Sequence, residues 1–152
     1  MRAVIVSAVL ALVASPALAQ GVQESLELSR EVVDKQKRII VAGSLPLSDE
    51  EADAFWPLFD EFQKELKKID RRSDRLIAEY SAEYATLEGA RARAMIDEAL
   101  RIEEDRVKLK RLWLKRMEPA LPPRLLARYF QLENKFQAVV AADLAKQIPL
   151  FP

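Results

Sequence analysis

Residues 48–87 read SDEEADAFWPLFDEFQKELKKIDRRSDRLIAEYSAEYATL and predict one long amphipathic helix. Apolar and aromatic side chains recur at alternating spacings of three and four residues, which places them along one face of an α-helix. The positions on this face are Ala52, Phe55, Phe59, Phe62, Leu66, Ile69, Ser73, Leu76, Tyr80, Glu83 and Leu87. All but the serine and the glutamate are apolar or aromatic, so we expect a partner helix along most of Asp49 to Leu87.

The start of this helix carries the strongest local pattern in the segment. Ser48 is placed to accept a hydrogen bond from an early backbone N–H, and Glu51, three residues later, completes a capping box. Acidic residues in the first turn also favour the positive end of the helix dipole. Pro57 lies inside the pattern and cannot donate its backbone hydrogen bond, so we expect a kink there rather than a stop.

Glycines and prolines divide the rest of the chain into three further helices. The first is predicted from about Val22 to Ala42, with Gly43 as the residue that ends it. Gly89 marks the turn after the long helix, and a third helix is predicted from about Ala90 to Glu118. Prolines 119, 122 and 123 then separate it from a fourth helix over residues 123–147. The fold expected is therefore all-α: a long antiparallel helical hairpin with flanking N- and C-terminal helices, four helices in all.

Apolar stripes run along each of these helices. In the first, Leu28, Val32 and Ile39 form one stripe, with Leu26, Val33 and Ile40 beside it; in the fourth, Leu126, Tyr129, Phe130, Phe136, Val140 and Leu144 are expected to face inward. The third helix has two adjacent stripes, Met95, Ala99, Ile102, Leu109 and Trp113, and then Ile96, Leu100, Val107, Leu114 and Met117. A face this wide implies two neighbours, which predicts a homodimer. The apolar tail 148–152 either docks on the body or stays exposed.

The amino terminus has the organisation of a cleavable export signal. Arg2 is followed by an apolar run, a helix-breaking Pro16 and the small residues of Ala17-Leu18-Ala19. This predicts a signal peptide over residues 1–19, cleavage before Gln20, and a periplasmic protein whose single helical domain spans 20–152. The apolar run is too short for a spanning helix and no later segment is apolar enough, so no membrane insertion of the remainder is expected.

The composition excludes several classes of function. The chain has 24 basic and 24 acidic residues, and removing residues 1–19, which contain one base and no acid, leaves 23 against 24. This balance gives no reason to expect a nucleic-acid partner. The chain contains no histidine and no cysteine, which removes the commonest general base, the common nucleophilic arrangements and the commonest metal ligands. We therefore predict neither an enzyme nor a cofactor or metal site.

One candidate site emerges from the hairpin. A short turn at Gly89 makes its helices antiparallel, so facing residues have numbers that sum to about 178. This brings the basic stretches 64–75 and 106–116 together, and the candidate protein-binding residues are Lys64, Lys67, Lys68, Arg71, Arg72, Arg75, Arg106, Lys110 and Arg111, with Trp56 and Tyr84 beside the main apolar face. We call the nine cationic residues the basic belt. It is either a binding surface or solvated charge balanced by nearby acids.

The layout resembles the family of small exported helical proteins typified by Spy and CpxP. That family carries a degenerate Leu-Thr-x-x-Gln motif, usually twice, at helix starts. Leu47-Ser48-Asp49-Glu50-Glu51 is similar to the first copy, and Leu121-Pro122-Pro123-Arg124-Leu125 occupies the place of the second. The stretch LLARYFQLENK, residues 125–135, resembles the sequence that follows it. Residues 45–57 look even more like a set of uncharacterised proteobacterial exported proteins with this layout.

The resemblance implies a helical hairpin with flanking helices and a role in envelope stress. It implies either chaperone-like holding of unfolded proteins or binding to a sensor, through a surface with basic and apolar character. Two functions are therefore expected: a non-enzymatic protein that binds unfolded or envelope proteins, or an accessory regulator that binds a single envelope signalling partner.

Overall fold

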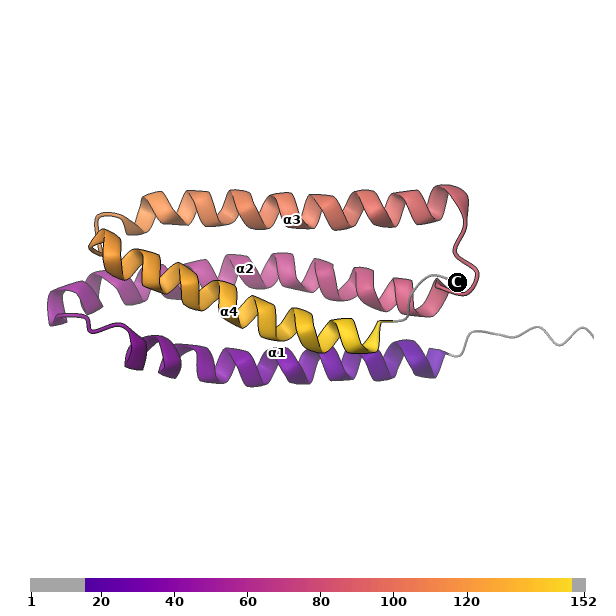
Figure 1. The fold of residues 1–152 in the computed structure, drawn as a ribbon, viewed down its shortest axis with the longest axis horizontal. Helices are drawn as coiled ribbons and strands as arrows, with labels where there is room; N and C mark the ends of the chain where they lie inside the picture. The colour runs from indigo at the N-terminus through magenta and orange to yellow at the C-terminus, as the bar shows by residue number, and fades with distance from the viewer. Residues whose placement is uncertain (1–15, 149–152) are drawn as a thin grey trace, which may run out of the picture.

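The structure, a computed structural model, describes residues 16–148 and consists of four helices joined by short connections. In chain order these are α1 (Pro16–Ser44), α2 (Asp49–Glu83), α3 (Gly89–Met117) and α4 (Pro123–Gln147). No strand occurs among the described residues. The all-α prediction with four helices is confirmed, and α2 and α3 form the expected long hairpin (Figure 1).

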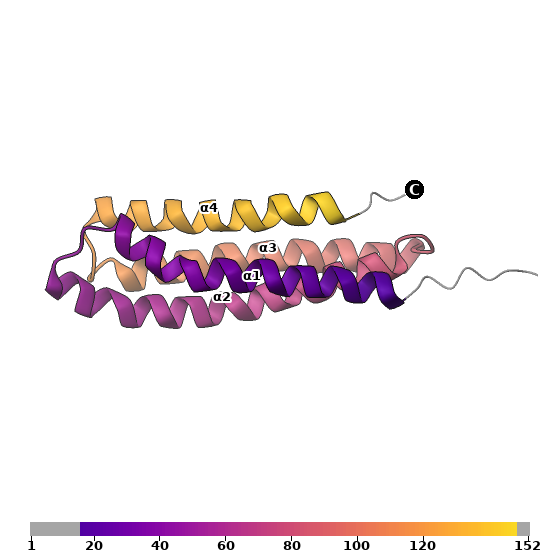
Figure 2. The ribbon, with the colours of Figure 1, turned by 90° about the horizontal axis from the view of Figure 1, so that it is seen from below.

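The four helices form an up-and-down bundle in which consecutive helices run in opposite directions (Figure 1). The extensive contacts are those between α2 and α3, α1 and α2, and α1 and α4. In Figure 1, α1 and α3 lie on opposite sides with α2 and α4 between them, and Figure 2, turned by 90°, places α2 and α4 on opposite sides. Helices α1 and α3 are therefore diagonal to one another across the bundle.

The capping box at the start of α2 is confirmed in both directions. The backbone N–H of Glu51 donates to the Ser48 hydroxyl at 3.2 Å, and the backbone N–H of Ser48 donates to the Glu51 carboxylate at 2.9 Å. The helix continues through Pro57 to Glu83. At 1.5 Å per residue its 35 residues make a helix about 52 Å long.

The Ser48→Ala variant should lose about 1 kcal/mol of unfolding free energy, because it leaves an early N–H of α2 without its acceptor. Urea denaturation followed by circular dichroism measures this loss. Ser44→Ala, in the last turn of α1, serves as a control because Ser44 caps no helix start. An unchanged midpoint in Ser48→Ala would show that the cap does not contribute to stability.

The turns follow the expected residues with one correction. Gly89 has a φ of +52°, the left-handed conformation that glycine adopts without strain, and Pro123 occupies the first turn of α4. Gly43 does not end α1. The helix runs to Ser44, and the backbone N–H of Leu45 still donates to the Val41 carbonyl at 2.9 Å. The physical reason is that Leu45 is buried, so the chain stays helical until this side chain reaches the core.

Helix ends differ in smaller ways as well. Helix α1 begins at Pro16 rather than near residue 22, and α2 ends at Glu83, four residues before the expected end. Of the predicted signal peptide, residues 1–15 lie outside the described residues and 16–19 belong to the start of α1. Of the apolar tail, residues 149–152 also lie outside them, while Ile148 follows α4 directly.

The core lies where α2 meets the ends of the other three helices. Its buried residues are Val41, Leu45, Phe55, Phe59, Phe62, Leu66, Trp113, Met117, Leu121, Leu126 and Tyr129. Phe62 is central to it, because its ring packs edge-on against Trp113 at 5.9 Å, Tyr129 at 6.2 Å and Phe130 at 6.1 Å between ring centroids. The inward face expected for α2 is confirmed from Phe55 to Ile69.

Candidate functional site

Most of the basic belt is engaged inside the molecule. Arg72 binds Asp105 at 2.7 Å and Glu98 at 2.9 Å, and Arg106 binds Asp70 at 2.6 Å. These pairs join α2 to α3, and their residue numbers sum to 170–177, close to the expected 178. The hairpin register is therefore confirmed, and the two basic stretches do come together.

Three further belt lysines also have partners. Lys67 pairs with Asp34 of α1 at 2.9 Å, Lys68 pairs with Glu65 at 2.7 Å, and Lys110 donates to the side-chain oxygens of Asn134 and Gln137, each at 2.9 Å. Burial lowers the pKa of Lys110, and the nearby guanidinium of Arg106 lowers it further. Lys67 and Lys110 join α2 and α3 to other helices, whereas the Lys68 pair lies within α2. These contacts leave less of the belt for a partner.

Four belt residues keep their charge free at the surface. Lys64, Arg71 and Arg75 of α2 and Arg111 of α3 are exposed and make no ion pair with any residue in the part of the chain that the structure describes. The basic belt therefore divides into an internal set that stabilises the bundle and this free set.

The two aromatic candidates lie at opposite ends of α2. Trp56 packs against Phe55 and Phe59, and the guanidinium of Arg38 covers its ring at 4.4 Å. Tyr84 lies at the other end, with its ring 6.3 Å from that of Tyr80. They are 28 positions apart in the sequence, which corresponds to about 42 Å of helix, so the two rings do not belong to one site.

A buried polar layer, which was not predicted from the sequence, crosses the middle of the bundle. Lys37 of α1 and Glu133 of α4 pair at 3.2 Å although their side chains are only 7% and 0% exposed. Gln63 of α2 connects them, because it accepts from Lys37 at 2.9 Å and donates to Glu133 at 2.6 Å. Tyr129 donates its hydroxyl hydrogen to Glu133 at 3.2 Å, and burial together with this carboxylate raises the pKa of the phenol well above 10.0.

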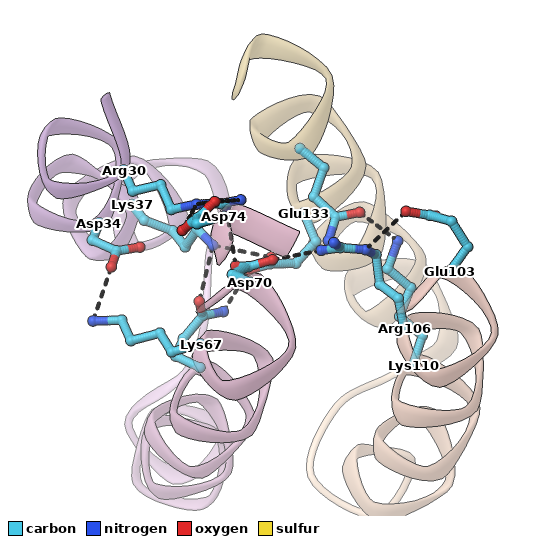
Figure 3. A network of polar contacts seen from close by, with 12 residues as sticks. Arg30, Asp34, Lys37, Lys67, Asp70, Asp74, Glu103, Arg106, Lys110 and Glu133 are labelled. Atoms are coloured by element: carbon cyan, nitrogen blue, oxygen red, sulfur yellow. Dashed lines mark hydrogen bonds and ion pairs between the residues drawn. The ribbon is translucent and has the colours of Figure 1, made fainter. Parts of the chain in front are cut away.

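A second polar group lies next to this layer, toward the hairpin turn. Arg30 of α1 binds Asp74 through two nitrogens at 2.7–2.8 Å and approaches Asp70 at 3.4 Å, and Asp70 also binds Arg106. Burial raises the pKa of Asp74 above its ordinary value, against the lowering effect of Arg30. Figure 3 shows how these side chains from all four helices meet across the bundle.

The residues of these two groups have a pattern that could have indicated them. Glu133 lies seven residues after Leu126 and seven before Val140, on the inward stripe of α4, and Lys37 lies four residues before the buried Val41. A charged residue inside an otherwise apolar stripe indicates a buried partner, since an isolated buried charge is very costly.

Helix α1 consequently turns a charged face toward the bundle and an apolar stripe toward the solvent. Its inward face carries Arg30, Asp34 and Lys37, which bind α2 and α4. Its apolar stripe, Leu28, Val32 and Ile39, points outward and is 48–73% exposed. We call these three residues the α1 stripe. Exposed large apolar side chains aligned on one helix are typical of a surface that another molecule covers.

Comparison of the chain with protein-family models, with curated proteins and with solved structures gives no match. The resemblance to Spy and CpxP stays a prediction. None of the helices formed by the described residues combines the length and apolar character that crossing a bilayer requires. The same residues contain no group of three or more acidic side chains placed to hold a metal ion.

Proposed function

We propose that this protein binds other proteins through the α1 stripe, as a non-enzymatic, chaperone-like protein of the bacterial envelope that holds unfolded chains. The observation that carries the proposal is that α1 turns its charged face inward and its apolar stripe outward. Ion pairs fix the inner face of this helix, and Leu28, Val32 and Ile39 are held in water. The stripe is thus available without any unfolding of the bundle, as a holding protein requires.

Charge beside the α1 stripe supports the same function. Lys35 lies within the line of the stripe and pairs with Glu31 at 2.6 Å. A groove of about 470 Å³ between α1, α2 and α4 is lined by both residues, by further carboxylates, by Lys67 and by the free Arg71, which supplies its unpaired positive charge. Unfolded chains offer apolar segments together with charged groups. A surface with apolar and basic character side by side fits such segments better than an apolar surface alone. The predicted export signal and the predicted family resemblance support a periplasmic location for this activity.

The test is suppression of aggregation of an unfolded client protein by the purified protein. Val32→Glu puts a carboxylate in the middle of the α1 stripe, and we expect about tenfold more protein to be needed for equal suppression. Val139→Glu on α4 is the matched control, since Val139 is 55% exposed against 48% for Val32 and lies off the stripe. Both variants should keep the melting temperature of the parent within a few degrees.

Two results would contradict the proposal. One is that a several-fold excess of the parent protein leaves aggregation unchanged. The other is that Val32→Glu and Val139→Glu suppress aggregation equally well. Recovery of one partner at equal stoichiometry, lost in Val32→Glu and retained in Val139→Glu, would instead indicate the alternative function, an accessory regulator of a single envelope signalling protein.

A further inference from the structure

The outer side of α4 carries three cations that have no partner in the rest of the bundle. Arg124, Arg128 and Lys135 are exposed, and none of them forms an ion pair with another residue in the part of the chain that the structure describes. At 100° per residue they lie within about 40° of one another around the helix, so they form one line about 17 Å long. We call these three residues the α4 row.

No exposed acid of the same helix segment offsets this charge. Residues 123–142 contain one acid, Glu133, whose side chain has no exposure and is paired inside the bundle. The charge that this segment shows to the solvent is therefore entirely positive. The free cations of the basic belt have a different setting, since Lys64, for example, shares its groove with Glu61 and Glu65.

A groove of about 600 Å³ follows the α4 row and reaches the last residue of α1. Besides the three cations, its lining residues are Ser44, Ala127, Gln131 and Leu132. No acidic residue of the described chain lines it. Helix α4 lies on the side of the bundle opposite α2 (Figure 2), so a large partner can approach the α4 row along its whole length.

The chemistry of this face fits a surface that carries many phosphate groups better than it fits a protein or a single small anion. Stable protein interfaces have a core of large apolar or aromatic side chains, and the groove offers only the half-buried Leu132 of that kind. A single anion needs cations that converge on it, whereas Arg124 and Lys135 are about 17 Å apart along the helix. Phosphate groups spread over a lipid surface can meet each cation separately.

We propose that the α4 row binds the phosphate groups of an anionic lipid surface, with α4 lying along that surface and no part of the bundle inserted into the bilayer. This activity is separate from client binding, which the proposed function assigns to the α1 stripe. Each basic side chain near a negatively charged lipid surface strengthens binding about fivefold, so the α4 row should give about a hundredfold preference for anionic over neutral lipid.

Sedimentation of the purified protein with large vesicles tests the binding. Vesicles made of equal parts of phosphatidylglycerol and phosphatidylcholine should bind the protein at lipid concentrations up to about 5 mM, and vesicles of phosphatidylcholine alone should not. Raising the salt from about 0.05 M to about 0.5 M should release the protein, because salt screens the charge contacts. The chain has equal numbers of acids and bases, so its net charge does not explain such binding.

Matched double variants test whether the α4 row is responsible. Arg128→Gln/Lys135→Gln removes two of the three contacts and should weaken binding to the anionic vesicles about 25-fold. Lys64→Gln/Arg75→Gln removes the same charge from free, exposed cations of α2, on the opposite side of the bundle, and should bind like the parent. Both variants should keep the melting temperature of the parent within a few degrees, since the four side chains are exposed.

A fluorescent label tests the orientation, because the chain has no cysteine of its own. A polarity-sensitive dye attached to Gln131→Cys, within the groove, should change its emission when the anionic vesicles are added. The same dye attached to Lys64→Cys on α2 should not respond. A response at Lys64→Cys without one at Gln131→Cys would overturn the proposed orientation.

Three results would overturn the proposal itself. The first is that the anionic vesicles do not bind the protein, and the second is that the two double variants bind them equally well. The third is binding to soluble poly-L-glutamate without binding to the vesicles, which would indicate an acidic protein segment as the partner instead. None of these results bears on client binding, which is tested at Val32.

Discussion

The Lys37→Met variant is expected to lose about 3–5 kcal/mol of unfolding free energy, because removal of one partner leaves the other as an uncompensated buried charge. That other charge is Glu133, whose side chain has no exposure and whose oxygens receive hydrogen bonds from Lys37, Gln63 and Tyr129. Urea denaturation at neutral pH, followed by circular dichroism, measures the loss.

Two further variants show whether the charge itself is responsible. Adding Glu133→Gln to Lys37→Met should recover most of the loss, because a neutral amide can still bond to Gln63 and Tyr129 without a counter-ion. Lys67→Met removes an ion pair to Asp34 whose side chains are 51% and 34% exposed, and should cost less than about 1 kcal/mol. Equal losses in Lys37→Met and Lys67→Met would mean that the buried layer is no more important than a surface pair.

The Trp113→Ala variant is expected to lose about 3–5 kcal/mol through the cavity it leaves in the core. Trp113 is 2% exposed, packs edge-on against Phe62 and is covered by the guanidinium of Arg116 at 3.9 Å from the ring centroid. Neighbouring side chains cannot close so large a gap without straining the α2–α3 contact. The loss should appear in unfolding curves recorded by circular dichroism, since the substitution removes one of only two tryptophans.

The neighbouring residue supplies the control. Leu112 is 55% exposed, and Leu112→Ala should change the unfolding free energy by no more than about 0.5 kcal/mol. If Trp113→Ala and Leu112→Ala unfold at the same urea concentration, the packing of α3 against α2 described above is wrong.

Sequence periodicity was sufficient to predict which apolar residues of α2 and α4 face the core, and insufficient to do so for α1. Phe55, Phe59 and Phe62 recur at helical spacing and are buried, as a single apolar stripe requires. Helix α1 has an apolar stripe as well, yet its charged face points inward. Periodicity identifies two faces of a helix, but the choice of the inner face here depends on Asp74 and Glu133, which are distant in sequence.

The candidate site shows the same limit. The hairpin register follows from the short turn at Gly89, so the meeting of the two basic stretches could be predicted. Which cations remain free depends on the reach of individual carboxylates, such as Asp105 to Arg72 and Asp70 to Arg106. The positions of the charges along the sequence do not show which cations find a carboxylate partner.

The order of the helices in the bundle has a consequence for how the chain folds. Helix α2 packs on both of its neighbours in sequence, α1 and α3, whereas the contact of α1 with α4 joins the two ends of the described chain. A chain that emerges amino terminus first can form the first two contacts early, since they close short loops. The α1–α4 contact must wait for the last helix.

Until α4 arrives, the ammonium group of Lys37 lacks the carboxylate of Glu133 and stays hydrated. We therefore expect loss of the Lys37–Glu133 pair to accelerate unfolding more than it slows folding, since late-forming contacts are absent from the transition state. The pair would then determine the lifetime of the folded bundle rather than the rate at which it forms.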